Sequence, residues 1–152
     1  MRIQFGKYLG LVATVSLLAA CQSQYHEGFS TSRTVYFDFG SSKLNHSGAA
    51  TVREASDILI KNQTRFKMVR GDERISRPAM AYLSGHTDTV GSSNGNQRLS
   101  EERVTSVRKE MLANGSRSSA VSTKAYGKTQ PVVPGEGKKE AKNRRVEIRI
   151  VQ

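Results

Sequence analysis

The chain has 152 residues, of which 36% are hydrophobic, and this length and composition suit one globular domain with its own core. Its 24 lysines and arginines exceed its 13 aspartates and glutamates, and the formal net charge of +11 favours an anionic partner. A single cysteine excludes a disulfide within the chain, and three scattered histidines exclude a histidine-based metal site. We therefore expect a fold that its core alone stabilises, with no metal and no cofactor.

The first residues are typical of a secretory signal. Arg2 and Lys7 form a short basic region, and residues 11–20 form a largely apolar stretch. This stretch is too short to span a bilayer, which needs about 20 apolar residues. We expect residues 1–20 to be a signal peptide. Its removal lowers the net charge from +11 to +9, because Arg2 and Lys7 leave with it.

Leu18-Ala19-Ala20-Cys21 ends that stretch and resembles a bacterial lipobox. The resemblance implies cleavage just before Cys21 and lipidation of its thiol, with acyl chains such as palmitate that together make a stable anchor. An ordinary signal with a stray cysteine is the alternative, but Cys21 is the only cysteine and lies where the cleavage pattern requires one. In such lipoproteins an aspartate after the cysteine favours the inner membrane. Gln22 therefore implies the outer membrane, with the domain facing the periplasm.

Residues 21–33 comprise the cysteine and a polar stretch without periodicity, which predicts a tether to a domain over residues 34–152. Twelve tether residues reach at most about 40 Å when fully extended. The domain is therefore expected to stay close to the membrane surface. An exported chain does not meet nucleic acid, so the available polyanions are cell-wall carboxylates and lipid phosphates.

The first half of the domain predicts a strand, a helix and an unassigned basic segment. Alternating side chains predict a strand over residues 34–39. Ser47 is a candidate N-cap for a helix that runs to about Lys61. Residues 64–79 contain four arginines and one lysine, and they either meet lipid or wall anions or form a solvated loop.

The second half predicts a strand, a helix and two further strands. Residues 80–83 suit a buried strand, and Ser100 is a candidate N-cap for a helix that ends at Gly115. A third strand is expected to reach Tyr126, and residues 145–151 alternate as a half-exposed strand does. The order β-α-β-α-β-β predicts an α+β fold, an α/β sandwich in which helices cover one face of a mixed sheet.

Asp88 and Arg103 are the candidate charged pair of the chain. Asp88 follows the second predicted strand, and Arg103 is expected in the first turn of the next helix, facing back toward that loop. One carboxylate and one guanidinium so placed suit a zwitterion, with Asp88 binding an ammonium and Arg103 binding a carboxylate. The alternative is an ion pair between Asp88 and Arg103 that pins the loop to the helix.

Several motifs occur in an order typical of one known family. They are Gly85-His86-Thr87-Asp88 with Gly91, Asn96, Leu99-Ser100 and Arg103, preceded by residues 35–39 and followed by residues 126–131 and 143–148. Together they resemble the OmpA-like peptidoglycan-binding domain, also known as the OmpA C-terminal or Pal-type domain. The resemblance covers about residues 34–152, and the family's fold is the one predicted above.

The resemblance implies a ligand, the diaminopimelate of the peptidoglycan stem peptide. Its free end carries an amine and a carboxylate on one carbon. By resemblance, Asp88 pairs with the amine, Arg103 pairs with the carboxylate, Asn96 hydrogen-bonds the ligand from the loop, and Arg144 approaches from the last strand. Asp38 keeps two interpretations: it borders the pocket, or it bonds backbone amides of its own turn.

Three further positions bear on the site. Relatives commonly have an acidic or amide residue where this chain has Gly40, and often an aromatic residue where it has Gly95. These glycines put the tightness of the pocket and the choice of stem peptide in question. His86 is expected to act as a structural hydrogen-bonding residue.

We expect a lipoprotein that binds peptidoglycan without catalysis and anchors the outer membrane to the cell wall. The alternative is a Pal-like component that also docks periplasmic proteins of an envelope complex, which an exposed apolar patch on the helices would favour. A wall-metabolising enzyme ranks last. Asp38 and Asp88 would need a shared cleft in which Arg103 does not neutralise one of them, and no nucleophile or metal cluster supports catalysis.

Overall fold

The computed structural model describes residues 29–64 and 78–152. The predicted signal peptide, Cys21, most of the predicted tether and most of the basic segment 64–79 lie outside these ranges. The described elements are β1 (Ser30–Tyr36), α1 (His46–Thr64), β2 (Met80–Gly85), α2 (Ser93–Ala113), β3 (Val121–Ala125) and β4 (Arg145–Val151). Their order confirms the predicted β-α-β-α-β-β arrangement.

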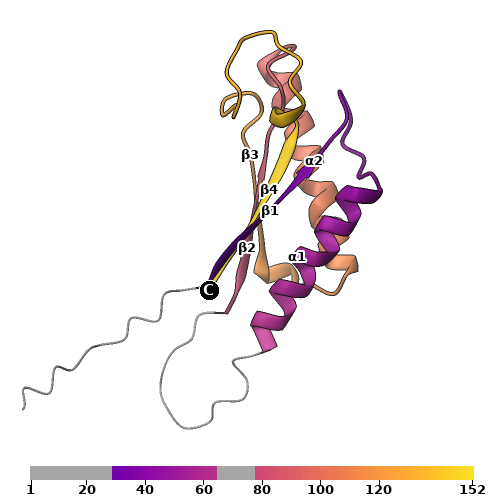
Figure 1. Ribbon diagram of the computed structural model, residues 1–152, viewed down its shortest axis with the longest axis vertical. Coiled ribbons are helices and arrows are strands. Elements are labelled where there is room, and N and C mark those ends of the chain that lie inside the picture. Colours follow the sequence, from indigo (N-terminus) through magenta and orange to yellow (C-terminus); the bar gives the residue numbers. More distant parts are fainter. Residues whose placement is uncertain (1–28, 65–77) are drawn as a thin grey trace, which may run out of the picture.

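The four strands form one mixed sheet in the order β1-β4-β2-β3. β4 pairs antiparallel with β1 and with β2, whereas β2 and β3 are parallel and are connected by α2. A parallel pair needs such a crossover, since a tight turn cannot return the chain to the same end of the sheet. Both helices cover the same face of the sheet (Figure 1), which confirms the predicted α+β class.

The core lies between the sheet and the two helices. Val35, Leu83 and Ile148 point from three strands toward the helices and are at most 1% exposed. Leu59 and Met111 meet them from α1 and α2 and are fully buried. A Cβ on Gly85 would lie 2.6 Å from the backbone oxygen of Ser100, so only glycine lets α2 approach β2 this closely.

Both helices begin earlier than predicted. α1 begins at His46, and the Asn45 side chain, rather than Ser47, accepts a hydrogen bond from the Gly48 amide at 2.7 Å. α2 begins at Ser93 because Ser92 has an extended backbone and its hydroxyl accepts from the Gly95 amide at 3.1 Å.

The predicted N-cap at Ser100 was therefore wrong, and Ser100 lies inside α2. Its hydroxyl donates to the Gln97 backbone oxygen and accepts from the Gly127 amide. The earlier start also moves two predicted site residues. Asn96 lies in the first turn of α2, and Arg103 lies about three turns into the helix.

β1 begins at Ser30 and ends at Tyr36, whereas residues 34–39 were predicted. The reason is its partner β4, which pairs along the whole strand from Ser30 opposite Val151 to Tyr36 opposite Arg145. Residues 30–33 of the predicted tether therefore belong to the sheet. Their polar composition hid the strand, because β1 is an edge strand with one solvated face.

The two ends of the sheet differ in what they carry. Ser30, Met80 and Val151 share one end, where the described chain starts and where the C-terminus lies (Figure 1). At the other end, about 20 Å away along β1, three loops gather, over residues 37–45, 86–92 and 126–144. Among the described residues no helix has both the length and the apolar character that crossing a bilayer requires.

Candidate functional site

Arg103 has no exposed surface and connects two of the three loops. Its Nε donates to the backbone oxygen of Ser41 at 2.8 Å, its Nη1 to that of His86 at 2.9 Å, and its Nη2 to that of Asp38 at 3.1 Å. The guanidinium also lies 5.2 Å from the ring centroid of Phe37. Arg103 therefore sets the separation of the loops that follow β1 and β2.

The Arg103 guanidinium is charged at neutral pH despite its burial. Burial lowers its pKa to about 10, the nearby Asp88 carboxylate opposes this shift, and Arg144 adds to it. A guanidinium has five N–H groups. Three of them donate to the loop carbonyls, and the other two have no acceptor among the described residues.

Asp88 pairs with Arg144. The Asp88 side chain is only 5% exposed, and its Oδ2 accepts from Arg144 Nη1 at 3.3 Å. Arg144 also donates through Nε to the backbone oxygen of Phe37 at 3.1 Å. The structure thus pairs Asp88 with Arg144 rather than with Arg103, the ion pair considered from sequence. A charge-assisted bond is usually about 2.7 to 2.9 Å long, so this pair is loose.

Asn96 and Asp38 support the loops in ways that the sequence did not predict. Asn96 is 5% exposed, and its Nδ2 donates to the backbone oxygens of Val90 and Ser92 at 2.9 and 3.0 Å. Asp38 is exposed, and its backbone oxygen accepts from Arg103 and from the Ser41 amide. Asn96 thus holds the loop that carries Asp88 in place. The backbone of Asp38 binds Arg103, which connects the loop over residues 37–45 to the loop that carries Asp88.

The third loop, residues 126–144, is held by side chains to which the sequence gave no role. Thr89 donates to the Gly135 oxygen at 2.5 Å and accepts from the Lys138 amide at 3.0 Å. Asn143 is 1% exposed and bonds both the amide and the oxygen of Val133. A side chain that closes an irregular loop follows no periodic pattern, so only the quoted motif over residues 143–148 pointed toward Asn143.

His86 lies two residues before Asp88 and is 2% exposed. Its ring stacks on Tyr126 with centroids 5.2 Å apart and planes 7° apart. Within the described residues neither ring nitrogen has a hydrogen-bond partner, and the structural hydrogen bonds of His86 are those of its backbone, with the Arg145 oxygen and with Arg103. Burial lowers the pKa of His86 to about 4, the Arg145 charge adds to this shift, and Glu147 opposes it.

The two glycines that depart from the family pattern occupy different environments. Gly40 has a φ of +66°, and a Cβ there would meet no atom within 4 Å. Asparagine and aspartate tolerate this backbone region better than other side chains, which is consistent with the acidic or amide residue of relatives. Gly95 lies in the first turn of α2, and its amide satisfies the Ser92 cap.

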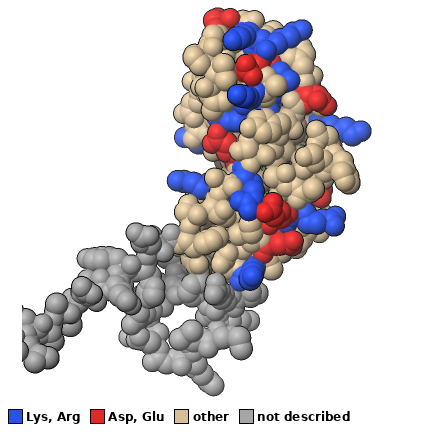
Figure 2. All heavy atoms as spheres, in the orientation of Figure 1, with Lys and Arg blue, Asp and Glu red and all other residues tan. Residues whose placement is uncertain are grey.

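The site therefore has one carboxylate, Asp88, and two guanidiniums, Arg103 and Arg144, at the loop end of the sheet. Such a set accommodates a ligand with charges of both signs and leaves one positive charge in excess for a carboxylate. On the face of the molecule that Figure 2 shows, basic and acidic side chains are interspersed and form no large patch of one sign. In the ranges that the structure describes, no cluster of histidine, cysteine and acidic residues could hold a metal ion.

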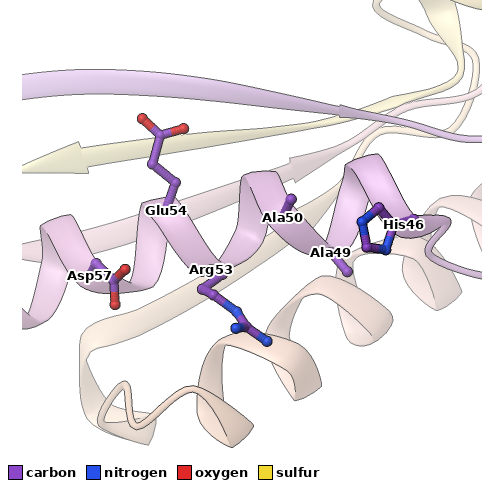
Figure 3. A pocket seen from close by; sticks show the side chains of 6 residues that line it. All are labelled: His46, Ala49, Ala50, Arg53, Glu54 and Asp57. Carbon is purple, nitrogen blue, oxygen red and sulfur yellow. The ribbon is translucent and has the colours of Figure 1, made fainter.

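A shallow hollow of about 500 Å³ lies elsewhere, on α1. Its lining side chains come from this helix alone, as Figure 3 shows, and include Arg53 and Asp57. None comes from the three loops. The hollow is therefore separate from the Asp88 site, and its exposed charges provide control positions for experiments on that site.

Comparison with known proteins agrees with this architecture. The model of the OmpA family matches residues 36–145. This chain belongs to the OmpA family. Outer membrane protein P5 of Haemophilus influenzae is 30% identical over 132 residues, which cover 80% of this chain and 33% of that protein. The chain thus spans about a third of the length of this OmpA-family relative.

Another relative of this OmpA-family chain matches along its whole length. The peptidoglycan-associated lipoprotein of Pseudomonas aeruginosa is 23% identical, and the alignment covers 97% of this chain and 98% of that protein. Among solved structures, the peptidoglycan-associated lipoprotein from Burkholderia pseudomallei has a TM-score of 0.64 at 25% identity, covering 78% of this chain and 89% of that one.

A second structural neighbour shows the fold alone. The C-terminal domain of Helicobacter pylori MotB has a TM-score of 0.59 at 21% identity, covering 76% of this chain and 81% of that one. Proteins named peptidoglycan-associated lipoprotein and MotB thus share this fold.

Proposed function

We propose that this OmpA-family chain is an outer-membrane lipoprotein that binds peptidoglycan non-covalently and anchors the membrane to the cell wall. Its similarity to proteins named peptidoglycan-associated lipoprotein, one of them matched along its whole length, supports the proposal. The lipobox-like Leu18-Ala19-Ala20-Cys21 supports the lipid anchor.

The observation that carries the proposal is the buried Asp88 carboxylate beside Arg144 and Arg103. Removing charges from water costs several kcal/mol per ion, and the attraction between them does not always compensate. A loose ion pair at 3.3 Å is therefore a poor way to stabilise a small domain. It is a suitable way to keep opposite charges ready for a ligand that carries both.

The geometry suggests how the free end of diaminopimelate binds. Its ammonium takes the place of Arg144 at Asp88. Its carboxylate accepts from the released Arg144 and from the two remaining N–H groups of Arg103. Each charge-assisted bond contributes about 1.5 to 3 kcal/mol, so two or three give a modest affinity. Many such domains on one polymer lattice add avidity. Asn96 and Asp38 act by shaping the loops.

The layout of the domain also suits an anchor. The described chain starts at Phe29, at the sheet end opposite the three loops (Figure 1). A membrane-attached tether would enter at that end, and the Asp88 site would face away from it. The sheet then separates the membrane attachment from the wall ligand by about 20 Å.

The alternatives have less support. The exposed large hydrophobic residues among those described are Phe29, Tyr36, Phe39, Tyr82 and Val132, and none lies on a helix. The apolar helix patch that would favour docking of envelope proteins is therefore missing from the described part, and such partners stay a prediction. Asp88 is paired with Arg144 rather than with Arg103, and this arginine neutralises one of the two carboxylates that acid–base catalysis would need.

Retention on purified sacculi tests the proposal. The full-length chain in detergent is compared with Asp88→Asn and Arg144→Ala, and free diaminopimelate serves as competitor. Asp57→Asn and Arg53→Ala are matched controls, because they make the same charge changes on the outer face of α1 (Figure 3). Far-ultraviolet circular dichroism confirms that each variant is folded.

We expect each site variant to lower retention at least about tenfold, the loss of one charge-assisted bond. The controls should bind like the wild type, and diaminopimelate should displace the wild type. Retention that survives Asp88→Asn and declines only with salt would overturn the site, because the basic surface would then hold the wall.

A further inference from the structure

The face of the sheet opposite the helices carries tyrosines and cations. Val35, Leu83 and Ile148 point toward the helices, and alternation along a strand sends their neighbours to the other side. No helix of the described residues covers that side (Figure 1). We call it the open face. Besides small polar residues and the half-buried Met80 and Val151, it carries the aromatic and charged residues Tyr36, Tyr82, Lys124, Tyr126, Arg145, Glu147 and Arg149.

Two cations of the open face lie against its rings. The Arg149 guanidinium is 5.6 Å from the ring centroid of Tyr82, and Lys124 Nζ is 5.0 Å from that of Tyr126. Within residues 29–64 and 78–152 neither Lys124 nor Arg149 forms a recorded ion pair with a carboxylate. Their charges are therefore available to an anionic partner, while the rings hold them close to the sheet.

The open face is continuous with the Asp88 site. Arg145 lies at the end of the open face nearest the loops and directly follows Arg144 in the chain. It pairs with His86, which lies two residues before Asp88. Arg145 is 5% exposed and bonds Glu147 at 2.6 Å, and its Nη1 has no hydrogen-bond partner among the described residues. A polymer whose side groups enter the Asp88 site would thus pass over this face.

We infer that the open face binds an acidic glycan strand, the polysaccharide from which the zwitterionic peptide ends of the proposed function extend. Tyr36 and Tyr82 are 52% and 39% exposed and offer ring surface to the apolar C–H faces of pyranose sugars. Lys124 and Arg149 offer N–H groups to the carboxylates of those sugar units of the strand that carry no peptide. The two exposed tyrosines lie about 16 Å apart across three strands, the length of a short oligosaccharide.

Charge and composition favour this occupant over a membrane. The open face carries three cations and the single anion Glu147, so its excess charge is positive. It exposes tyrosines and no large aliphatic side chain that would enter the acyl region of a bilayer. A glycan strand carries both carboxylates and apolar sugar faces. The cations of the open face would bind the carboxylates, and its tyrosine rings would contact the sugar faces.

The inference rests on the proposed function, and its test uses a separate probe. Binding of peptide-free peptidoglycan glycan strands to the full-length chain in detergent is measured by fluorescence anisotropy. The neutral sugar chitohexaose and phosphatidylglycerol vesicles serve as comparison ligands. The test variant is Tyr82→Ala with Arg149→Ala. The control, Phe29→Ala with Arg53→Ala, also removes one exposed ring and one cation, but neither belongs to the open face or to the three loops.

We expect the wild type to bind the glycan strands more tightly than chitohexaose. The test variant should weaken strand binding at least about tenfold, and the control should change it less than about twofold. Free diaminopimelate should bind the test variant as it binds the wild type. This result separates failure of the open face from failure of the Asp88 site.

Three results would overturn the inference: no strand binding by the wild type, equal weakening by control and test variants, or binding of the vesicles in place of the strands.

Discussion

The middle of the sheet and its loop end bury different kinds of side chain. The middle buries aliphatic residues such as Leu83 and Ile148, whose removal from water favours folding directly. The loop end buries Asp88, Arg103 and His86, each of which loses hydration there. Stability therefore comes from the middle of the sheet, and the loop end holds buried charged and polar groups at some cost in stability.

The largest effect is expected in the middle of the sheet. Leu83 is 1% exposed within the core between β2 and the helices, so Leu83→Ala leaves a cavity and should cost about 4 kcal/mol of unfolding free energy. Urea denaturation measures this. The folded fraction should still bind diaminopimelate normally, and an altered affinity would contradict the separation of the two regions.

A smaller effect is expected from pH at the loop end. His86 has a pKa of about 4 in the folded state and about 6.5 when unfolded, so protonation favours unfolding. The contribution of His86 to the unfolding free energy is complete above about pH 6.5. It declines by up to about 3 kcal/mol as the pH falls toward 4. His86→Gln should flatten the pH dependence of the unfolding free energy between about pH 4 and pH 6.5. Parallel profiles for wild type and His86→Gln would contradict this.

Arg103 is expected to affect stability less than a core leucine. Arg103→Ala deprives the oxygens of Ser41, His86 and Asp38 of their donor and should cost about 3 kcal/mol, because water that enters the vacated space replaces part of the lost bonding. Arg103→Lys retains the charge and should recover part of the stability. It should not recover diaminopimelate affinity, because lysine cannot hold both loops. Full recovery of binding by lysine would show that only the charge matters.

The smallest effect is expected at Gly40. Gly40 has a φ of +66° and open space around it. We therefore expect Gly40→Asn to change the unfolding free energy by less than about 0.5 kcal/mol. Gly40→Val should cost about 1 to 2 kcal/mol, because a β-branched residue is strained in this region. Thermal unfolding compares the two variants. Equal melting temperatures would show that the loop relaxes its backbone.

The sequence predicted the elements better than their limits. The order of strands and helices and the span of β4, Arg145–Val151, follow from periodicity and were confirmed. The start of β1 was missed because pairing with β4, rather than hydrophobic alternation, defines it. The start of α2 was missed because two serines, Ser92 and Ser100, both suit an N-cap, and only the tertiary structure selects Ser92.

The site residues were identified from motifs, but their contacts were not. Sequence spacing brought Asp88 and Arg103 to the same end of the sheet. It gave no indication that Arg103 would donate to three backbone oxygens or that Arg144 would be the ion-pair partner of Asp88. Such contacts depend on the paths of three irregular loops, and no periodic pattern encodes these. The roles of the residues in binding stay predictions.

Calorimetric titration of the full-length chain with diaminopimelate and with lysine tests the central claim most directly. The lysine is acetylated at its α-amine and amidated at its α-carboxylate, so it presents only a side-chain amine, without the carboxylate that diaminopimelate carries there. We predict that diaminopimelate binds to the wild type at least about tenfold more tightly than lysine, and that Asp88→Asn removes this preference. Equal affinities for both amino acids, or a preference that survives in Asp88→Asn, would contradict a zwitterion site at Asp88.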